Sequence, residues 1–400
     1  MDKERFTPQA TGEVRRFQNE LTNKADWQFI PAELPTGWEF PTRLWPLLGE
    51  AKEALGTLNG IGRTLPDPEL LIRPQQTREA IQSSKIEGTV VTPQQLLLYE
   101  LHPREPASAE GRLADWREVF NYTSALRRGC EMLKTLPICN RIIKAMHREL
   151  MFGVRGERKL PGEFRPMQVQ IGSSGRYVPP AASEIERLMG NLETYLNLDE
   201  YPYDPLVMCF LTHYQFEAIH PFADGNGRVG RCLLALMVYL KLDHHLPWLY
   251  LSPYFEQYDD EYANNLFRIS THGDWDRWVE FCLNGTIRQA RDSISRCERL
   301  NSLLKDYYKR ITAPSTRSET IIRQLFKNPI VNIREVRKIC GNISHNTAQR
   351  DIDRLVGDGI LSPLGTRRPR SYYAQEIWEI AYSDMGDAST ADADSAPDES

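Results

Sequence analysis

Apolar residues recur at three- and four-residue spacing through much of the chain between residues 45 and 300. This spacing is typical of amphipathic helices. Strand-like alternation is rare in the same part of the chain, and it is clearest around a glycine-rich turn, where it predicts a short hairpin over residues 168–178. The pattern therefore predicts a mainly α body, a helical bundle with one β-hairpin, behind a partly irregular arm of about 45 residues. The predicted helices cover residues 44–58, 74–87, 115–133, 137–151, 182–198 and 205–219, and another begins at Pro93.

The pattern changes after residues 310–318, a polar stretch with one proline that we interpret as a linker. Ser344 is placed to cap the last of three short helices that follow. Helix, helix, capped helix and hairpin is the order of elements in a winged helix-turn-helix. The predicted elements are helices at residues 319–326, 333–339 and 345–355 and strands at 360–363 and 370–373, around a basic turn.

These changes of pattern divide the chain into five parts. Its length of 400 residues favours two or three structural units. The last part is rich in Ala, Ser and Asp, which is typical of a disordered segment. The predicted parts are an N-terminal arm with a helical region over residues 1–110, a core over 111–300, a helix end and linker over 301–318, a winged-helix module over 319–382 and a disordered acidic tail over 383–400.

The charge of the chain is unevenly spread. The tail holds six acidic residues and no Lys or Arg, so the net charge of −5 becomes +1 when these six negative charges are left out. Residues 311–382 carry eleven Lys and Arg against seven Asp and Glu. This local positive excess keeps nucleic acid open as a partner of the winged-helix module.

The sequence also bears on the compartment. No apolar run approaches the roughly 18 residues that a membrane span needs, and no apolar segment follows the charged N-terminus, so no signal peptide is visible. The seven cysteines include no CxxC pair. Most of them lie in apolar helical surroundings, which favours buried free thiols in a reducing compartment. We therefore expect a cytoplasmic protein without a membrane partner.

The most informative stretch runs from His220 to Arg231, HPFADGNGRVGR, and a helical pattern follows it at once. A glycine-rich turn that leads into a helix offers unpaired backbone N–H groups and the positive end of a helix dipole. Such a turn is an anion site, and phosphate is the anion that it most often binds. Gly225 and Gly227 allow the backbone to approach the anion closely, and Asn226 adds side-chain donors.

The charged residues of this stretch suggest chemistry at the phosphate. Neutral His220 can accept a proton near pH 7, because the unperturbed pKa of histidine is about 6.5. Asp224 is a natural ligand for Mg²⁺, which prefers one or two carboxylates together with phosphate oxygens. Arg228 and Arg231 are three residues apart at the start of the helix and share one face. Two guanidinium groups there suit a di- or triphosphate.

Simpler interpretations of this stretch are open. Its three glycines form a GxGxxG pattern, but a dinucleotide fold needs a strand in front of that pattern, and residues 210–219 are predicted to be helical. A zinc site at His213, His244 and His245 lacks Cys or Glu partners at ligand spacing. A solvated loop with a satisfied histidine would need no function at all.

The stretch from His220 to Arg231 matches without gaps the signature of the Fic family, HxFx[D/E]GNGRxxR. Residues 161–165 and 177–180 resemble the segments that flank the family's target-binding hairpin, and the resemblance extends over about residues 70–290. It implies an AMP-transferring enzyme (an AMPylator), a nucleotidyltransferase that uses ATP. Such an enzyme moves AMP to a Ser, Thr or Tyr hydroxyl of a target protein or of itself and releases pyrophosphate.

The resemblance also implies roles for single residues. His220 would deprotonate the target hydroxyl, and Asp224 would hold Mg²⁺ across the phosphates. The glycine-rich turn would stabilise charge on the α-phosphate, and the two arginines would bind the outer phosphates. The hairpin at 168–178 would align the target chain by β-strand addition. Nucleotide contacts, with packing in the core as the alternative, are expected from Gln215, Tyr258 and Tyr262.

A second stretch, SSKIEG at residues 83–88, matches the family's inhibitory pattern, [S/T]xxxE[G/N]. Ser83 and Glu87 are four residues apart, hence on one face of a helix that Gly88 ends. Charges at a helix end usually contribute little, so the functional interpretation rests on the resemblance. It implies that Glu87 pairs with Arg231, that Ser83 lies near the phosphates, and that ATP then binds in a pose unsuited to attack. In some relatives the same glutamate positions water for the removal of AMP, which leaves a de-AMPylase open.

The winged-helix module allows two interpretations. Its polar and basic side chains suit DNA grooves and phosphates. A protein-docking or dimer module is the alternative, because Asp351 and Asp353 share the third helix, and a homodimer is expected. The whole chain is therefore an autoinhibited AMPylator, a transcription regulator whose Fic core senses a nucleotide, or an enzyme that transfers another phosphate-linked group. The side chains expected to contact DNA are Asn346, Gln349, Arg350, Arg367 and Arg368.

Overall fold

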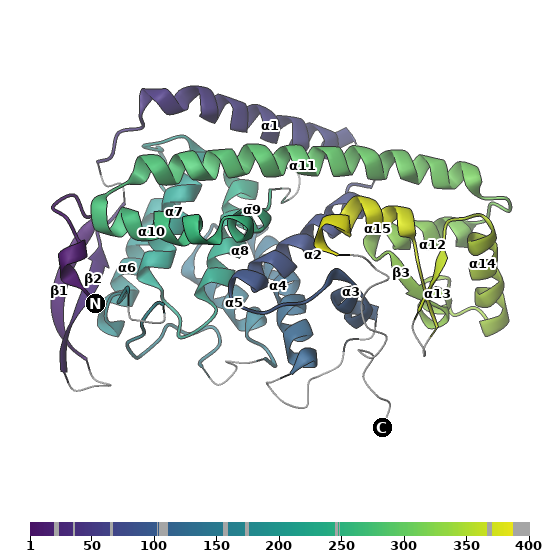
Figure 1. Ribbon diagram of the computed structural model, residues 1–400, viewed down its shortest axis with the longest axis horizontal. Coiled ribbons are helices and arrows are strands. Elements are labelled where there is room, and N and C mark those ends of the chain that lie inside the picture. Colours follow the sequence, from purple (N-terminus) through teal and green to yellow (C-terminus); the bar gives the residue numbers. More distant parts are fainter. Residues whose placement is uncertain are drawn as a thin grey trace.

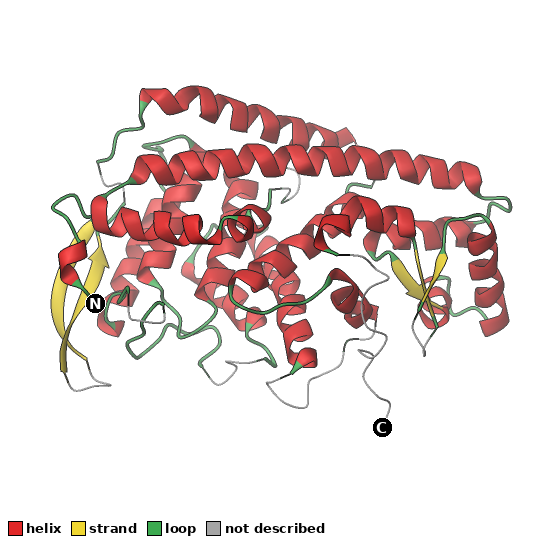
Figure 2. Ribbon diagram, in the orientation of Figure 1, coloured by secondary structure: helices red, strands yellow, loops and turns green. Residues whose placement is uncertain are grey.

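Helices dominate the architecture (Figure 2). After the short 3-10 helix η2 (Thr42–Leu44), α1 (Trp45–Thr64) lies beside α11 (Trp275–Arg310) along one long edge of the molecule (Figure 1). At 1.5 Å per residue α11 extends for about 54 Å, so it runs from the body to the C-terminal module. The computed structural model describes residues 1–19, 24–34, 37–64, 67–101, 103, 111–154, 159–172, 176–244, 247, 249–365 and 370–386.

The body is the predicted helical bundle, and α7 and α8 pack together at its centre. Nearly all of α7 is buried, so the helix is apolar on every side rather than on one stripe. It begins behind Asp204, whose side chain accepts a hydrogen bond from Leu206 N–H, and it ends where His220 adopts a left-handed conformation. The helices of the body are α4 (Arg112–Leu133), α5 (Asn140–Leu150), α6 (Ala182–Leu196), α7 (Pro205–Ile219), α8 (Asn226–Lys241), α9 (Ser252–Gln257) and α10 (Asp259–His272).

Helix α2 (Glu69–Ile86) connects the body with the C-terminal module. It begins five residues earlier than predicted, because Pro74 lies inside the helix instead of starting it. It packs against α4 and α9 on one side and against α12 (Thr316–Lys327) of the C-terminal module on another. Glu87 forms its C-cap, and α3 (Pro93–Leu101) follows after a short connection.

The N-terminal arm is more regular than the sequence predicts. After η1 (Lys3–Arg5), β1 (Gly12–Asn19) and β2 (Lys24–Pro31) form an antiparallel pair. The alternation of apolar and polar residues in these strands is weak, because no described side chain of β1 is fully buried. Only the end of β2, with Phe29 and Ile30, enters the core. The prediction of an irregular arm was therefore wrong for these two strands, which are stabilised by pairing more than by an apolar face.

The predicted hairpin at 168–178 is reduced to one antiparallel bridge between Ile171 and Tyr177, and residues 173–175 lie outside the described residues. The second half of this segment is bound to other elements. The Tyr177 hydroxyl donates to the Ala218 carbonyl at 3.0 Å, and Phe29 N–H donates to the Val178 carbonyl at 2.9 Å. These contacts fix the segment against α7 and β2 and limit its pairing with its own first half.

The C-terminal module contains the three predicted helices, and the Ser344 side chain caps the third by accepting a hydrogen bond from Thr347 N–H. The linker is shorter than predicted, because α11 reaches Arg310 and α12 begins at Thr316. Strand β3 was not predicted, since three residues are too few to show alternation. The elements of the C-terminal module are α12 (Thr316–Lys327), β3 (Ile330–Asn332), α13 (Ile333–Ile339), α14 (His345–Gly357), β4 (Ser362–Leu364) and β5 (Ser371–Tyr373), with strand order β3-β5-β4.

The chain then returns to the body through α15 (Gln375–Tyr382) and the 3-10 helix η3 (Ser383–Met385). α15 packs against α2 and α11, so the first residues of the predicted tail are part of the fold. Arg367 and Arg368 lie outside the described residues. In the ranges that the structure describes, no helix is long and apolar enough to cross a membrane. A small second core joins α3 to this module through Leu97, Ile330, Leu364, Trp378, Ala381 and Tyr382.

Candidate functional site

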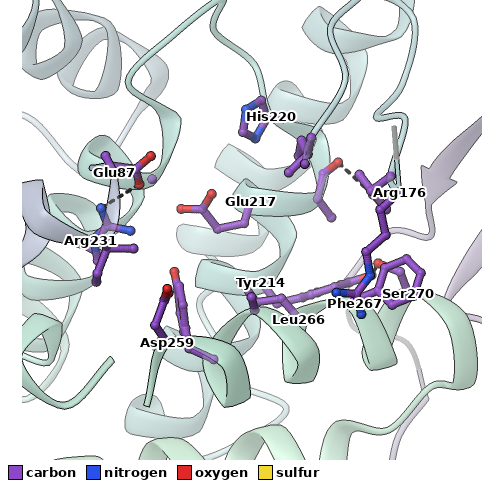
Figure 3. A pocket seen from close by; sticks show the side chains of 18 residues that line it. Glu87, Arg176, Tyr214, Glu217, His220, Arg231, Asp259, Leu266, Phe267 and Ser270 are labelled. Atoms are coloured by element: carbon purple, nitrogen blue, oxygen red, sulfur yellow. Dashed lines mark hydrogen bonds and ion pairs between the residues drawn. The ribbon is translucent and has the colours of Figure 1, made fainter. Parts of the chain in front are cut away.

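A cavity of about 310 Å³ lies between the end of α7, the start of α8, the end of α2 and α10 (Figure 3). Both informative stretches of the sequence contribute to its lining. His220, Gly227 and Arg231 come from the first stretch, and Glu87 comes from the second. The fold therefore brings two motifs that are far apart in the chain to one site.

His220 stands where α7 ends, with a backbone φ of 51°. The Nε of Arg165 donates to the His220 carbonyl at 2.8 Å, and the rest of this buried guanidinium donates to two other carbonyls, which fixes the turn. Burial, followed by the positive charge of Arg165, lowers the pKa of His220 to about 4. The imidazole is therefore neutral at pH 7 and able to accept a proton.

The turn after His220 is shaped by Asn226. Its Oδ1 accepts from Phe222 N–H and its Nδ2 donates to the Phe222 carbonyl, both at 2.8 Å. The amide expected to face an anion is thus used to close the loop. Gly227 lies so close to Glu87 that a Cβ at this position would collide with the Glu87 carboxylate. Gly225, which has a φ of 74°, is the N-cap of α8.

His147 on α5 supports the same turn and was not predicted. Its Nδ1 accepts a hydrogen bond from Gly162 N–H at 2.8 Å, which leaves Nε2 to donate to the Asp224 carbonyl at 3.1 Å. The ring stacks on Phe222 with a centroid distance of 3.8 Å. Burial lowers the pKa of His147 to about 4, so the neutral tautomer holds the loop. A buried histidine on an amphipathic helix gives no local signal of this role.

Arg228 and Arg231 face different carboxylates. Arg228 forms a 2.5 Å ion pair with Glu118 of α4, and its other acidic neighbour is Asp224 at 3.8 Å. Both Arg228 and Glu118 are buried, and neither is among the residues that line the cavity. Arg231 therefore lines the cavity, whereas Arg228 lies behind the residues that line it.

Arg231 is held by the end of α2. Its Nη2 donates to Glu87 Oε1 and to the Ser83 carbonyl, and its Nε donates to Ser83 Oγ, each at 2.8 Å. Burial raises the pKa of Glu87, but the charge of Arg231 outweighs it and leaves the pKa below its ordinary value. The pair is therefore ionised at neutral pH. Ser83 is fully buried behind Arg231 and does not line the cavity.

Asp224 is the carboxylate nearest to the turn. Its Oδ2 is 2.9 Å from Lys159 Nζ, and its Oδ1 accepts from Gly225 N–H at 2.7 Å. Burial raises the pKa of Asp224, and Lys159 outweighs this effect and lowers it. The described residues include no group of three side chains that could hold a metal ion by themselves. One carboxylate fits Mg²⁺, which takes its remaining ligands from phosphates and water.

The three expected nucleotide contacts are placed differently. Tyr262 lines the cavity, and its hydroxyl is hydrogen-bonded to His213 Nε2 at 2.8 Å. Gln215 donates instead to the Ala32 carbonyl at 2.9 Å, and the Tyr258 hydroxyl accepts from Arg288 at 2.7 Å. Neither of these two residues is among those that line the cavity.

Glu79 is a further residue that sequence reasoning missed. Its Oε1 accepts from the Tyr122 hydroxyl and from Ser252 Oγ, both at 2.6 Å, and its Oε2 accepts from Ser252 N–H at 3.0 Å. Burial raises the pKa of Glu79. These bonds tie α2 to α4 and α9, one helical turn before Ser83. The only signal in the sequence is the four-residue spacing of Glu79, Ser83 and Glu87.

The sequence matches known families in the region that forms the site. Residues 45–131 match the Fic/DOC family N-terminal region, and residues 137–238 match the Fic/DOC family. The "Protein adenylyltransferase Fic" of Aedes aegypti is 39% identical over 74 residues, which are 18% of this chain and 14% of the relative. The protein of the same name from Drosophila erecta is 34% identical over 104 residues, 26% of this chain and 20% of the relative. The match thus spans at most a fifth of these two relatives.

Two solved structures share the fold. A Fic family protein from Desulfovibrio desulfuricans G20 is 21% identical with a TM-score of 0.54, and the alignment covers 84% of this chain and 97% of that one. Fic-1, residues 134–508, from C. elegans is 20% identical with a TM-score of 0.52 and coverages of 64% and 76%. At this identity the likeness concerns the fold alone.

Proposed function

Because the chain belongs to the Fic/DOC family, as residues 45–131 and 137–238 show, we propose that it is a protein adenylyltransferase. It moves AMP from ATP to a side-chain hydroxyl of a target protein or of itself. The observation that carries the proposal is one cavity lined by a neutral base, His220, by Gly227 of the glycine turn and by Arg231. Relatives named "Protein adenylyltransferase Fic" support it.

The chemistry follows from the positions of these groups. The target hydroxyl oxygen attacks the α-phosphorus, the bond to the bridging oxygen breaks, and pyrophosphate leaves with its electron pair. His220 takes the hydroxyl proton, which contributes roughly 10²–10⁴-fold to the rate. Backbone N–H groups at the start of α8, those of Asn226 and Gly227, stabilise the charge that builds on the phosphate. Arg231 binds the outer phosphates when Glu87 releases it.

Asp224 would hold Mg²⁺, which when bound neutralises phosphate charge and orients the leaving group. Lys159 Nζ lies 2.9 Å from one oxygen of this carboxylate and lowers the pKa of Asp224, which keeps the carboxylate ionised. We expect Asp224→Asn to lower AMP transfer strongly and to leave the fold intact, because Asp224 is partly exposed. Transfer at the wild-type rate by this variant would exclude the role of Asp224.

The pair of Glu87 and Arg231 keeps the enzyme inhibited. The guanidinium that a γ-phosphate needs is engaged by Glu87 at 2.8 Å and by two atoms of Ser83. ATP then binds without the contact that aligns it for attack. Since Glu87 is at the very end of α2, a small movement of that end releases Arg231.

One experiment tests both the activity and its inhibition. Wild type, Glu87→Gly and the double variant Glu87→Gly/His220→Ala are incubated with ATP labelled at the α-phosphate, and labelled protein is measured. We expect faster self-labelling with Glu87→Gly, no labelling with the double variant, and ATP binding by both. Equal labelling by wild type and Glu87→Gly would exclude inhibition by Glu87, and labelling without His220 would exclude the mechanism.

The target chain binds at the segment that carries the bridge between Ile171 and Tyr177. Ile171 and Tyr177 line the cavity, so a strand laid along this segment brings a hydroxyl to the α-phosphate. Pro substitution at Gln170, which removes a backbone N–H donor, is expected to reduce target labelling and to leave ATP binding unchanged. Loss of both would mean that the change disturbs the cavity itself.

A second function, DNA contact by the C-terminal module, is favoured by the surface of α14. Asn346 and Arg350 are exposed there. Asp351, which speaks against DNA in the sequence, is buried and paired with Arg317 at 2.7 Å, so it does not face outward. Duplex DNA binding is measured at two salt concentrations with wild type and Arg350→Ala. Affinity that is absent, or that does not fall as salt rises, would exclude this function.

A further inference from the structure

Glu217 is a carboxyl group in the cavity to which the mechanism above assigns no role. It lies on the last turn of α7, three residues before His220. Its side chain extends into the cavity between His220 and the pair formed by Glu87 and Arg231 (Figure 3). This is the region where the phosphates of a nucleotide bind under the proposed function.

The backbone of α8 makes room for this side chain. A Cβ at Gly230 would collide with Glu217 Oε1 and would come within 3.0 Å of Phe216 Cδ1. Gly227, one turn earlier, makes room for the Glu87 carboxylate in the same way. Each of these two glycines of the motif therefore leaves space for one glutamate carboxylate. The packing against Gly230 fixes the position of the Glu217 side chain.

One oxygen of the Glu217 carboxyl group has no partner among the described residues. Glu217 Oε1 is shielded from solvent, and it has no hydrogen-bond partner in the part of the chain that the structure describes. A shielded polar atom without a partner is costly, and here it belongs to a carboxyl group that lines the cavity, which points to a ligand for that group. The charged and titratable groups facing it are Glu87 of α2, His220 at the end of α7, Arg231 of α8, and Asp259 and Tyr262 of α10.

The protonation state of Glu217 decides whether its carboxyl group can donate a hydrogen bond. Burial raises its pKa to about 8, Arg231 opposes this rise, and the Glu87 carboxylate adds to it. At pH 7 the group is therefore mostly a neutral acid with an O–H to donate. A charged carboxylate at this place would repel phosphate oxygens, whereas a neutral acid can bind them.

We propose that Glu217, as a neutral carboxylic acid, donates a hydrogen bond to a phosphate oxygen of the nucleotide bound beside Arg231. The inference rests on the proposed function in taking a nucleoside triphosphate as the ligand. The contact is assigned to the phosphates and not to the base, because Glu217 faces Arg231, while apolar side chains such as Leu266 and Phe267 line the cavity away from that pair (Figure 3).

The test measures binding of ATP and of adenosine by calorimetry at pH 7. Glu217→Ala removes the donor and should weaken ATP binding about 10- to 100-fold, the usual effect of losing a hydrogen bond to a charged group. Glu217→Gln keeps the shape and an N–H donor and should bind ATP within about threefold of wild type. Adenosine binding should be unchanged in both variants. Gly230→Ala, which displaces the carboxyl group but retains it, should resemble Glu217→Ala.

The pH dependence gives a readout that packing alone would not change. Wild type should bind ATP with constant affinity from pH 6.5 to about 7.5 and progressively more weakly as pH rises through about 8, because ATP selects the protonated group. Glu217→Gln should lose this decline. Glu87→Gly should move the decline to lower pH, since Glu87 raises the pKa of Glu217. The control Glu261→Gln, outside the cavity and 3.7 Å from Arg277, should follow wild type.

Three results would overturn the proposal. They are wild-type ATP affinity in Glu217→Ala, an equal loss of adenosine affinity, and an unchanged decline with pH in Glu217→Gln. Because AMP transfer is not measured, these outcomes are separate from a failure of the proposed function. If wild type binds no ATP, the adenylyltransferase assignment fails, and if wild type and Glu217→Ala bind it equally, only the role of Glu217 is lost.

Discussion

Arg228 and Arg231 are alike in sequence and different in their surroundings. Both are buried on the first turns of α8, and each pairs with one glutamate, at 2.5 Å for Glu118 and 2.8 Å for Glu87. Glu118 is 3% exposed, lies within α4 and also accepts a hydrogen bond from Thr89. The Glu87 side chain is 36% exposed and belongs to the C-cap of α2.

The difference lies in how firmly each partner is held. Arg228 and Glu118 are both buried, and an unpaired charge at such a place is strongly unfavourable. Arg231 has two hydrogen bonds to Ser83 in addition to the one to Glu87, and it lines the cavity. The same residue type at a spacing of three is thus a buried structural pair in one case and, under the proposed function, an exchangeable contact in the other.

The largest effect is expected from Glu118→Ala. It leaves Arg228 buried with only the more distant Asp224, at 3.8 Å, as a countercharge and should lower the free energy of unfolding by about 3–5 kcal/mol. Urea unfolding measures this loss. The matched control on the same helix is Glu131→Ala, whose partner Arg128 is 3.9 Å away and whose side chain is 53% exposed, and its effect should stay within about 0.5 kcal/mol. Equal effects of the two variants would contradict the structural role of Glu118.

A second ion pair joins the middle of α2 to η3, which follows the C-terminal module. It tests whether contacts from outside the body hold α2 in place. Arg78 of α2 is buried and donates to both oxygens of Asp384, at 2.6 and 2.7 Å. We expect Asp384→Ala to lower the free energy of unfolding by about 2 kcal/mol and to increase self-labelling with ATP, because α2 loses an anchor. Asp384 also accepts a hydrogen bond from Arg296 of α11 at 3.1 Å. Asp292→Ala, which removes the other carboxylate partner of Arg296, 2.8 Å away, serves as the control. Lower stability without increased labelling would show that the anchor does not bear on inhibition.

Glu87→Ala should lower the free energy of unfolding less than Glu118→Ala does, and its main effect should be on ATP affinity. We expect a loss of about 1 kcal/mol, since Glu87 is partly exposed and Arg231 keeps Ser83. ATP affinity should rise about tenfold, because a phosphate no longer competes with a carboxylate. Thermal unfolding with and without ATP measures both quantities. A stability loss as large as that of Glu118→Ala would remove the distinction between the two arginines.

The smallest effect is expected from Ser83→Ala. Arg231 Nε loses its bond to Ser83 Oγ, while the Ser83 carbonyl and Glu87 remain bound to Nη2. Self-labelling with ATP should therefore rise only about threefold, well below the increase for Glu87→Gly. The neighbouring variant Ser84→Ala is the control, because Ser84 is buried on the same helix and its hydroxyl has no hydrogen-bond partner among the described residues. An increase equal to that of Glu87→Gly would mean that Ser83 is the main restraint.

The two motifs of the site were predictable because each is a continuous stretch. His220 to Arg231 and residues 83–88 carry their spacing within one or two helical turns. The residues that support them, such as His147 and Glu118, are single polar positions on amphipathic helices. Nothing nearby in the sequence distinguishes them from ordinary core or surface residues. Most helices were predicted for the same local reason, while the pair of β1 and β2 depends on a partner strand and was missed.

The sequence by itself determined the helical bundle, the base at His220, the glycine turn and the two arginines three residues apart. Tertiary structure decided which carboxylate each arginine meets and that Asn226 closes its own loop. It also decided that Glu217 lines the cavity with one carboxyl oxygen that has no partner in the part of the chain that the structure describes. The reason is physical. Helix formation and turns depend on neighbours within a few residues, whereas ion pairing and pKa values depend on distance and burial between segments that only the fold brings together.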